Sequence, residues 1–248
     1  APYRGAGRPE VGFAMERAVD LVANELDLDP AEVRFRNMIT ADQMPYSVGL
    51  TYRDGVPIVY DSGDYPKALE RALEELGGLK SIRKRQKDAL RQGRYIGLGL
   101  GCYVEGTGVG PFEGARVKID ATGKIVVATG ACPQGQGHET VFAQVTADLW
   151  KVPIEDVYVT VADTAHVTMG YGTLASRSTV TASGAIQLAS DQIKEKAFAI
   201  ASDILEAGEQ DLELRDSGVG VKGVPGMHMS FRDIATAARP GWGHKRPE

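Results

Sequence analysis

Two short polar segments carry residue types that suit an anionic or heterocyclic ligand. The first, PQGQGHET, covers residues 133–140, and the second, YGTLASRSTVTASGA, covers residues 171–185. Each leads into a stretch whose apolar residues recur at helical spacing. The start of a helix leaves backbone N–H groups unpaired and pointing along the axis, which favours an anion there. Both segments are therefore candidate ligand-binding loops.

The first loop alternates amides with glycines before a histidine. Gln134 and Gln136 carry side-chain amides, which both donate and accept hydrogen bonds and so suit the edge of a heterocycle. Gly135 and Gly137 let the backbone approach a ligand closely, and His138 follows them. The alternative is a polar loop that only caps the helix predicted for residues 138–150, with both glutamines solvated.

The second loop concentrates hydroxyl groups around one arginine. Within nine residues the chain places Thr173, Ser176, Arg177, Ser178, Thr179 and Thr181. Hydroxyls and free N–H groups at a helix start are what a phosphate group needs. An ordinary helix cap explains one or two of these residues but not all of them. Two such helix starts suggest one extended phosphorylated ligand.

A third segment, YRGAGR at residues 3–8, places Arg4 and Arg8 on either side of three small residues. The small residues allow a guanidinium group to approach a ligand. A turn held by surface ion pairs is the alternative.

Common nucleotide-binding patterns are absent. The glycine-rich run at residues 97–114 does not accommodate G-x-G-x-x-G, and Gly123-Lys124 is followed by isoleucine rather than Ser or Thr. The glycines of residues 97–114 are better explained by close backbone packing or by backbone approach to a ligand.

Composition excludes several other classes of protein. The 248 residues include 28 basic and 33 acidic ones, for a net charge of −5, which gives no reason to expect nucleic acid or an anionic membrane as partner. The basic cluster at residues 79–94 is interpreted as a solvated helix or linker. No stretch approaches the about 18 apolar residues of a membrane span.

Cysteine and histidine usage points away from disulfides and zinc. Cys102 and Cys132 are each embedded in apolar sequence, and the four histidines show no zinc-ligand spacing. We expect buried free thiols and a reducing, cytoplasmic location, with no metal held by protein ligands.

The order of elements favours an α+β fold. Helices are expected at residues 11–26, with one buried face, and at 27–39, 64–78, 138–150 and 177–206; β-structure is expected at 45–63, with an Asp54-Gly55 turn, and at 114–132 and 157–163. There is no βαβ rhythm, so a doubly wound sheet is disfavoured. A subdomain boundary is expected near residues 80–93.

Together the three polar segments resemble the molybdenum-binding large subunit of the xanthine dehydrogenase, aldehyde oxidase and carbon monoxide dehydrogenase family. PYRGAGRPE with the later VRFRNMI is similar to the substrate-arginine loop and the helices after it. GACPQGQGHETVFAQVTADLW and YGTLASRSTVTASGAI are similar to the pterin-binding and phosphate-binding segments. The resemblance covers nearly the whole chain in family order.

The resemblance implies a fold, a cofactor and a reaction. Residues 1–85 would end a first molybdopterin-binding subdomain and residues 93–248 would form part of a second, the two packed together. The family oxidises a carbon of an aldehyde or N-heterocycle at a molybdopterin-held molybdenum, often as the cytosine dinucleotide, with oxygen from water. Iron–sulfur and FAD subunits are the implied partners, in a dimer of heterotrimers.

Site residues follow from the resemblance position by position. Arg4 matches the arginine that orients the substrate. The segment Gln134, Gly135, Gln136, Gly137 and His138 matches the pterin-binding loop; Thr173, Ser176 and Ser178, with Arg177 as an addition, match the phosphate-binding residues.

Two departures from the family pattern limit these expectations. Carbon monoxide dehydrogenases carry a copper-binding cysteine after the substrate arginine, where this chain has Gly5. The catalytic glutamate of the K-G-x-G-E-like motif has no counterpart, and VKGVPG at residues 221–226 is the nearest segment. We therefore expect a fragment of an enzyme that is inactive by itself; a non-catalytic module of the same fold is the alternative.

Overall fold

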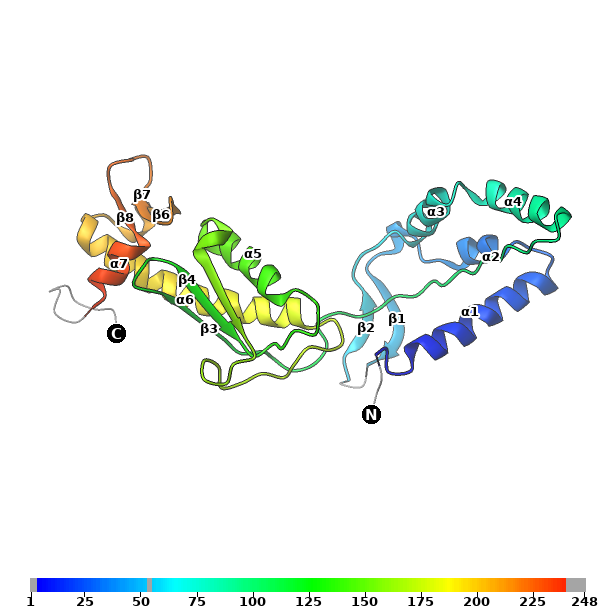
Figure 1. The fold of residues 1–248 in the computed structure, drawn as a ribbon, viewed down its shortest axis with the longest axis horizontal. Helices are drawn as coiled ribbons and strands as arrows, with labels where there is room; N and C mark the ends of the chain where they lie inside the picture. The colour runs from blue at the N-terminus through cyan, green and yellow to red at the C-terminus, as the bar shows by residue number, and fades with distance from the viewer. Residues whose placement is uncertain (1–3, 53–54, 240–248) are drawn as a thin grey trace. The chain divides into compact units, whose positions relative to one another are not determined.

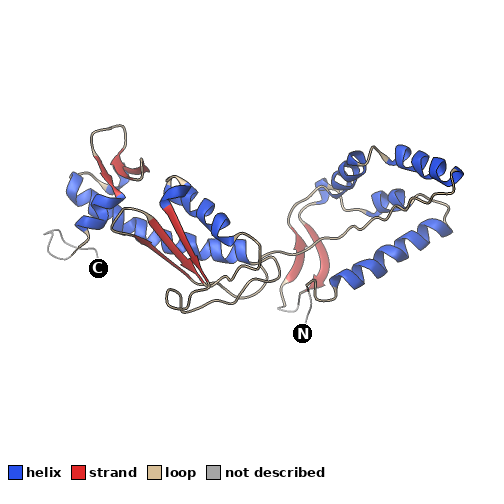
Figure 2. Cartoon of the chain, in the orientation of Figure 1, coloured by secondary structure: helices blue, strands red, loops and turns tan. Residues whose placement is uncertain are grey.

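The chain forms two compact units in a computed structural model, which describes residues 4–52 and 55–239. The first unit ends at Val104 and the second begins at Glu105. Both combine helices with short strands, as the α+β expectation requires (Figure 2). The units divide downstream of the boundary expected near residues 80–93, because Ile82 packs against Leu69 and Leu73 of the first unit. The assignment of residues 1–85 and 93–248 to two cofactor-binding subdomains stays a prediction.

Within its described residues, the first unit has four α-helices and one hairpin. Its elements are α1 (Arg8–Glu25), α2 (Pro30–Asn37), β1 (Tyr46–Thr51), β2 (Pro57–Tyr60), α3 (Tyr65–Glu75) and α4 (Leu79–Arg91). The antiparallel hairpin pairs Tyr46 with Tyr60, which confirms the β-structure predicted for residues 45–63. The turn of this hairpin is predicted at Asp54-Gly55. Gly55 has a φ of 84°, and Asp54 lies outside the described residues.

Helix α1 does not bury the apolar stripe that its spacing predicts. Among the described residues only Ala23 of this helix is buried, and Phe13 is 69% exposed. The reason is that α1 meets α2 through its polar side: Arg34 of α2 pairs with Glu16 at 2.9 Å and with Asp20 at 3.0 Å. Residues 16, 20 and 23 share one helix face, so the apolar stripe points elsewhere. The expectation of one buried apolar face is wrong for this helix.

Buried Arg34 anchors the segment that leads out of the first unit. The carboxylate of Glu16 that accepts from Arg34 also accepts from the backbone N–H of Cys102, at 3.1 Å. Burial raises the pKa of the Cys102 thiol, and the nearby Glu16 charge raises it further. Cys102 is half-buried and free, whereas Cys132 is free and exposed, so the expectation of two buried thiols is wrong for Cys132.

Up to residue 239, where the described part of the chain ends, the second unit contains two three-stranded sheets and three α-helices. Its elements are β3 (Ala115–Ile119), β4 (Ile125–Thr129), α5 (His138–Trp150), β5 (Val157–Val161), α6 (Ser178–Leu205), β6 (Leu212–Arg215), β7 (Gly218–Val221), β8 (His228–Ser230) and α7 (Phe231–Ala237). Short 3-10 helices lie at Ile154–Asp156 and Glu209–Asp211 in this unit and at Ala41–Gln43 in the first. The predicted helix 138–150 and the long helix after Arg177 are confirmed.

One βαβ connection occurs, although the sequence showed no such rhythm. Strand β4 pairs antiparallel with β3 and parallel with β5, and α5 forms the crossover between the parallel strands. Helix α6 packs on β3 and against α5, while α5 packs on β5 (Figure 1). The two helices therefore cover the same face of this sheet.

The core of the second unit lies between the β3–β4–β5 sheet and its helices. Ile125 and Val127 of β4 are fully buried, as are Phe142 of α5 and Ile186 of α6. Trp150 closes the far end of α5: its indole N–H donates to the hydroxyl of Ser190 at 3.0 Å. Every second residue of β4 is fully buried. Burial of alternate residues is typical of a strand that has one face covered.

Candidate functional site

Both predicted loops leave the sheet from the carboxyl ends of its parallel strands. Thr129, the last residue of β4, pairs with Val161, the last residue of β5. The loop 130–137 follows β4 and the loop 162–177 follows β5. Ligands of α/β sheets bind in the crevice outside the carboxyl ends of parallel strands. The βαβ connection thus brings two polar segments together that lie far apart in the sequence.

The two loops are held against each other by a contact between glycines. A Cβ atom added to Gly130 would lie 2.3 Å from the Cα of Gly170, and one added to Gly170 would lie 2.7 Å from the carbonyl oxygen of Gly130. Real Cβ atoms do not approach backbone so closely, so both positions require glycine. The contact holds the first residue of the loop 130–137 against the middle of the loop 162–177.

Glycine conformation shapes the first loop at the start of α5. Gly135 and Gly137 have φ values of 102° and 70°, which disfavour any residue with a Cβ. Within the loop, the side-chain carbonyl of Gln136 accepts from the backbone N–H of Gln134. This bond orients the Gln136 amide and leaves its NH₂ group with no protein partner among the described residues. The first helical hydrogen bond of α5 runs from the N–H of Val141 to the carbonyl of Gly137. The N–H groups before Val141 in the first turn therefore have no acceptor within the helix.

His138 begins α5 and carries an unpaired buried nitrogen. Its side chain is 3% exposed, and its ring lies 5.3 Å from that of Phe142 between centroids. Nδ1 of His138 has no hydrogen-bond partner in the described part of the chain. Buried polar atoms are nearly always hydrogen-bonded, so this nitrogen fits a site that a polar ligand completes.

Hydroxyl groups gather at the start of α6, as the second loop predicts. Ser178 opens the helix, and its hydroxyl donates to the hydroxyl of Thr173 at 3.2 Å. Ser176 has a φ of 51° and Ala175 a φ of 47°, a left-handed turn that directs the loop into the helix. Ser176, Arg177 and Ser178 therefore lie within one turn of the N-terminal end of α6.

Arg177 occupies a different position from the one expected for a phosphate ligand. All five N–H donors of its guanidinium group are taken by protein acceptors, namely the carbonyls of Val109, Pro111, Phe112 and Gly172 and the carboxylate of Glu113. Its side chain is fully buried. No donor remains for a phosphate group in this arrangement, which argues against a direct contact, and the assignment of Arg177 to the site stays a prediction.

The first turns of α5 and α6 lie at the same end of the second unit (Figure 1). Trp150 stands twelve residues after His138, and its hydrogen-bond partner Ser190 stands twelve residues after Ser178. Helices rise by about 1.5 Å per residue, so the two helix starts lie at about the same distance along their axes from the bond between Trp150 and Ser190. The residues predicted in the two loops thus belong to one region.

Arg4, the remaining predicted residue, belongs to the first unit and is exposed. It precedes Gly5, which has a φ of 94° and whose added Cβ would lie 2.6 Å from a ring carbon of Pro9. Position 5 therefore accepts a side chain only if the turn before α1 rearranges.

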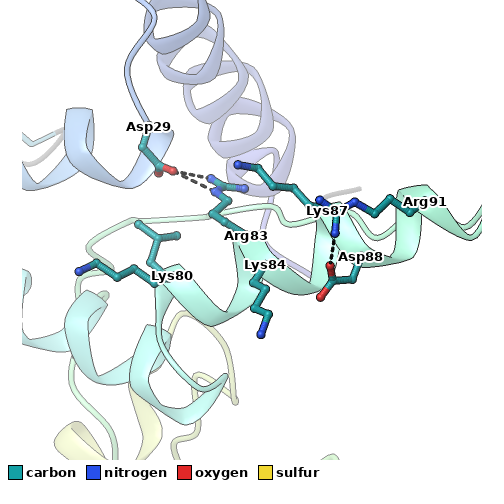
Figure 3. A pocket seen from close by; sticks show the side chains of 8 residues that line it. Asp29, Lys80, Arg83, Lys84, Lys87, Asp88 and Arg91 are labelled. Carbon is teal, nitrogen blue, oxygen red and sulfur yellow. Dashed lines mark hydrogen bonds and ion pairs between the residues drawn. The ribbon is translucent and has the colours of Figure 1, made fainter.

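Most of the basic cluster at residues 79–94 lies in α4, which spans Leu79–Arg91. This helix presents five basic side chains beside a hollow of about 580 Å³, shown in Figure 3: Lys80, Arg83, Lys84, Lys87 and Arg91. Arg83 pairs with Asp29 at 2.8 Å, and Arg91 pairs with Asp88 at 3.2 Å. Ile82 and Ala89 are buried on the opposite side. The cluster is thus a solvated helix rather than a linker.

Within residues 4–52 and 55–239, no group of three or more His, Cys, Asp or Glu side chains is arranged to hold a metal ion. No helix in that part of the chain is long and apolar enough to cross a membrane.

Comparison with known proteins decides the family. A model described as a molybdopterin cofactor-binding domain matches residues 72–245, and a second model of the same description matches residues 1–38. The chain belongs to the molybdopterin cofactor-binding domain family. The resemblance inferred from the three polar segments is confirmed, and the glycine contact and helix starts described above lie within the larger of the two matched ranges.

The relatives of the chain include proteins named as dehydrogenases and an oxidoreductase. The chain is 34% identical to the carbon monoxide dehydrogenase large chain of Afipia carboxidovorans over 92% of this chain and 30% of that protein. It is 38% identical to the 6-hydroxypseudooxynicotine dehydrogenase complex subunit gamma of Paenarthrobacter nicotinovorans, over 96% and 30%. The solved quinoline 2-oxidoreductase of Pseudomonas putida matches with a TM-score of 0.81 and 34% identity, over 97% and 32%.

The chain spans about 30% of the length of these curated relatives. The α+β expectation for a part of the molybdopterin-binding region is confirmed by the solved structure. One residue of the site region escaped sequence reasoning: Glu113, whose pairing with Arg177 spans 64 residues. The sequence indicates Glu113 only by placing an acidic residue within a glycine-rich run.

Proposed function

We propose that the two loops at the carboxyl ends of β4 and β5 bind a molybdopterin cofactor in the large subunit of a molybdenum hydroxylase. The observation that carries the proposal is the contact between Gly130 and Gly170, which holds together the two loops that lead into α5 and α6, in a chain of the molybdopterin cofactor-binding family. The residues fit such a ligand: the orphaned Nδ1 of His138 and the free N–H groups of the first turns are polar groups that need partners.

The first loop is assigned to the pterin. Gln136 directs its amide NH₂ to a pterin acceptor, because its carbonyl is held by Gln134. Gln134 and His138 border the same edge, and Gly135 and Gly137 keep the backbone close to it. Each group acts by positioning the heterocycle rather than by ligating metal.

The second loop is assigned to the phosphate-bearing end of the cofactor, which we propose to be the cytosine dinucleotide form. Thr173, Ser176 and Ser178 offer hydroxyl groups, and the first turn of α6 offers N–H groups and the positive end of its dipole. Arg177 contributes through its contacts with the loop, since its own donors are occupied.

When bound, the cofactor supplies the molybdenum at which an aldehyde or N-heterocycle carbon is oxidised with oxygen derived from water. Arg4 orients the substrate, and electrons pass to iron–sulfur and FAD groups on partner subunits. The proposal places the whole protein in the cytoplasm as a dimer of heterotrimers. Oxidation of carbon monoxide with copper is disfavoured, because Gly5 offers no thiolate and its added Cβ would meet Pro9.

The substitution Gln136→Ala in the full-length protein tests the pterin assignment. One lost hydrogen bond of about 0.5–1.5 kcal/mol lowers cofactor affinity roughly two- to tenfold. The fold should be little affected, because the loop is exposed. Molybdenum and pterin content and the melting temperature are measured together.

Gln210→Ala is the matched control, since Gln210 is exposed and lies in the 3-10 helix before β6. It should leave cofactor content unchanged. A Gln136→Ala protein with wild-type molybdenum content and a much lower melting temperature would show that Gln136 serves only the fold.

A further inference from the structure

A fully buried ion pair stands behind the second loop. Arg177 Nη1 and Glu113 Oε2 lie 2.6 Å apart, and both side chains are 0% exposed. Burying two charges is costly unless each is paired and its remaining hydrogen-bonding capacity is satisfied. Here every donor of the guanidinium group is satisfied, so the pair is a complete network and not an accidental surface contact.

The guanidinium group ties two segments together. On one side Nε donates to the carbonyl of Val109 at 3.2 Å, and Nη2 donates to the carbonyls of Pro111 and Phe112. On the other side Nη1 donates to the carbonyl of Gly172 at 2.8 Å. Four backbone carbonyls from residues 109–112 and 172 are therefore fixed by one side chain.

Glu113 completes the link from the opposite direction. Its Oε1 accepts from the backbone N–H of Tyr171 at 3.0 Å while Oε2 accepts from Arg177. The Tyr171 ring stacks on the guanidinium group, with Cζ of Arg177 4.9 Å from the ring centroid. Because both carboxylate oxygens are engaged and buried, Glu113 is not placed to exchange a proton with a substrate.

The same network surrounds a strained turn. Ala175 and Ser176 adopt left-handed backbone conformations, which non-glycine residues hold only when their surroundings enforce them. The carbonyl of Ser176 accepts from the N–H of Gly108 at 3.2 Å, a further bond from the segment that Arg177 fixes. The turn carries Ser176 and leads directly into Ser178, two of the residues assigned to phosphate.

We propose that Glu113 and Arg177 form a positioning pair that pre-organises the 171–178 loop for the phosphate-bearing end of the cofactor, without touching it. The proposal rests on the proposed function. It replaces a direct role for Arg177 with an indirect one, and it adds Glu113, which lies on a different segment. Pre-organisation raises affinity because the loop does not have to be ordered when the ligand binds.

The test compares three variants of the full-length protein with wild type, measuring melting temperature and bound molybdenum and molybdopterin. Arg177→Lys keeps the charge but has three donors in place of five. It should reduce cofactor content at least fivefold. Arg34→Lys is the matched control: a buried arginine, paired with Glu16 in the first unit, whose substitution should lower the melting temperature and leave cofactor content unchanged.

The other two variants separate positioning from folding. Glu113→Gln leaves a buried guanidinium group without its counter-charge, so melting temperature and cofactor content should both fall. The double variant Glu113→Gln with Arg177→Met removes both charges, which proteins often tolerate. Its melting temperature should recover toward wild type, while its cofactor content stays at least fivefold reduced because the carbonyl contacts are gone.

Two results would overturn the positioning role. A double variant that recovers both melting temperature and cofactor content would show that the pair serves stability alone. Arg177→Lys protein with wild-type cofactor content would show that the carbonyl contacts are dispensable, even if the double variant does not fold. Wild-type protein that holds no molybdopterin would instead reject the proposed function, and the positioning role with it.

Discussion

The contact between Gly130 and Gly170 brings the two loops together more directly than any polar residue does. A methyl group at either position would lie under 3 Å from the backbone of the other segment. Gly130 opens the segment that resembles the pterin-binding loop, but nothing in the sequence indicates that it contacts Gly170. Residue type alone therefore predicted the polar groups of the site but not the backbone contact that aligns them.

Gly130→Ala should destabilise the full-length protein, because the added methyl group must displace the chain at Gly170. Overpacking of this kind costs about 1–3 kcal/mol and sometimes more. Gly184→Ala is the control, since Gly184 is an exposed position within α6 with open space around its added Cβ. That change should stabilise the helix by up to about 1 kcal/mol. Chemical denaturation measures both, and equal effects from the two variants would contradict the packing role of Gly130.

Helices α5 and α6 set the geometry of the site through their packing. Both run the same way from the sheet edge, and the bond from Trp150 to Ser190 joins the end of α5 to the middle of α6. Trp150 also meets the Phe231 ring edge-to-face, with centroids 5.3 Å apart. The two helices are thus held together by contacts about twelve residues from their starts.

Ser190→Ala should lower the free energy of unfolding by about 1–3 kcal/mol, because it leaves the buried indole N–H without a partner. In the double variant with Trp150→Phe no such donor remains, so the loss should be smaller than the sum of the two single losses. Denaturant titration of the four proteins gives the coupling. Strictly additive losses would mean that the hydrogen bond does not join the helices.

Periodicity predicted the second unit better than the first. Helix 138–150 and the long helix after Arg177 appear as expected, since each has a clear start signal and an apolar stripe that the sheet covers. The stripe of α1 carries equal periodicity, yet Glu16 and Asp20 face the neighbouring helix because Arg34 is buried there. The parallel pairing of β4 with β5 and the pairing of Glu113 with Arg177 join distant residues, which spacing along the chain does not encode.

The predicted site residues are distributed over both units of the molecule. Arg4 belongs to the first unit, and the nine residues of the two loops belong to the second. Family models for the molybdopterin cofactor-binding domain match within both. The chain corresponds to about 30% of its curated relatives, so the activity proposed here is a property of the whole protein.

The most direct test is to measure molybdenum and molybdopterin bound to the purified full-length protein, expressed in a host that makes the cofactor. We expect molybdenum and pterin in equal amounts, with cytidine monophosphate released on hydrolysis of the bound cofactor. Release of a different nucleotide, or of none, would revise only the assignment of the second loop. A folded full-length protein that contains neither molybdenum nor pterin would contradict the claim that these loops bind the cofactor.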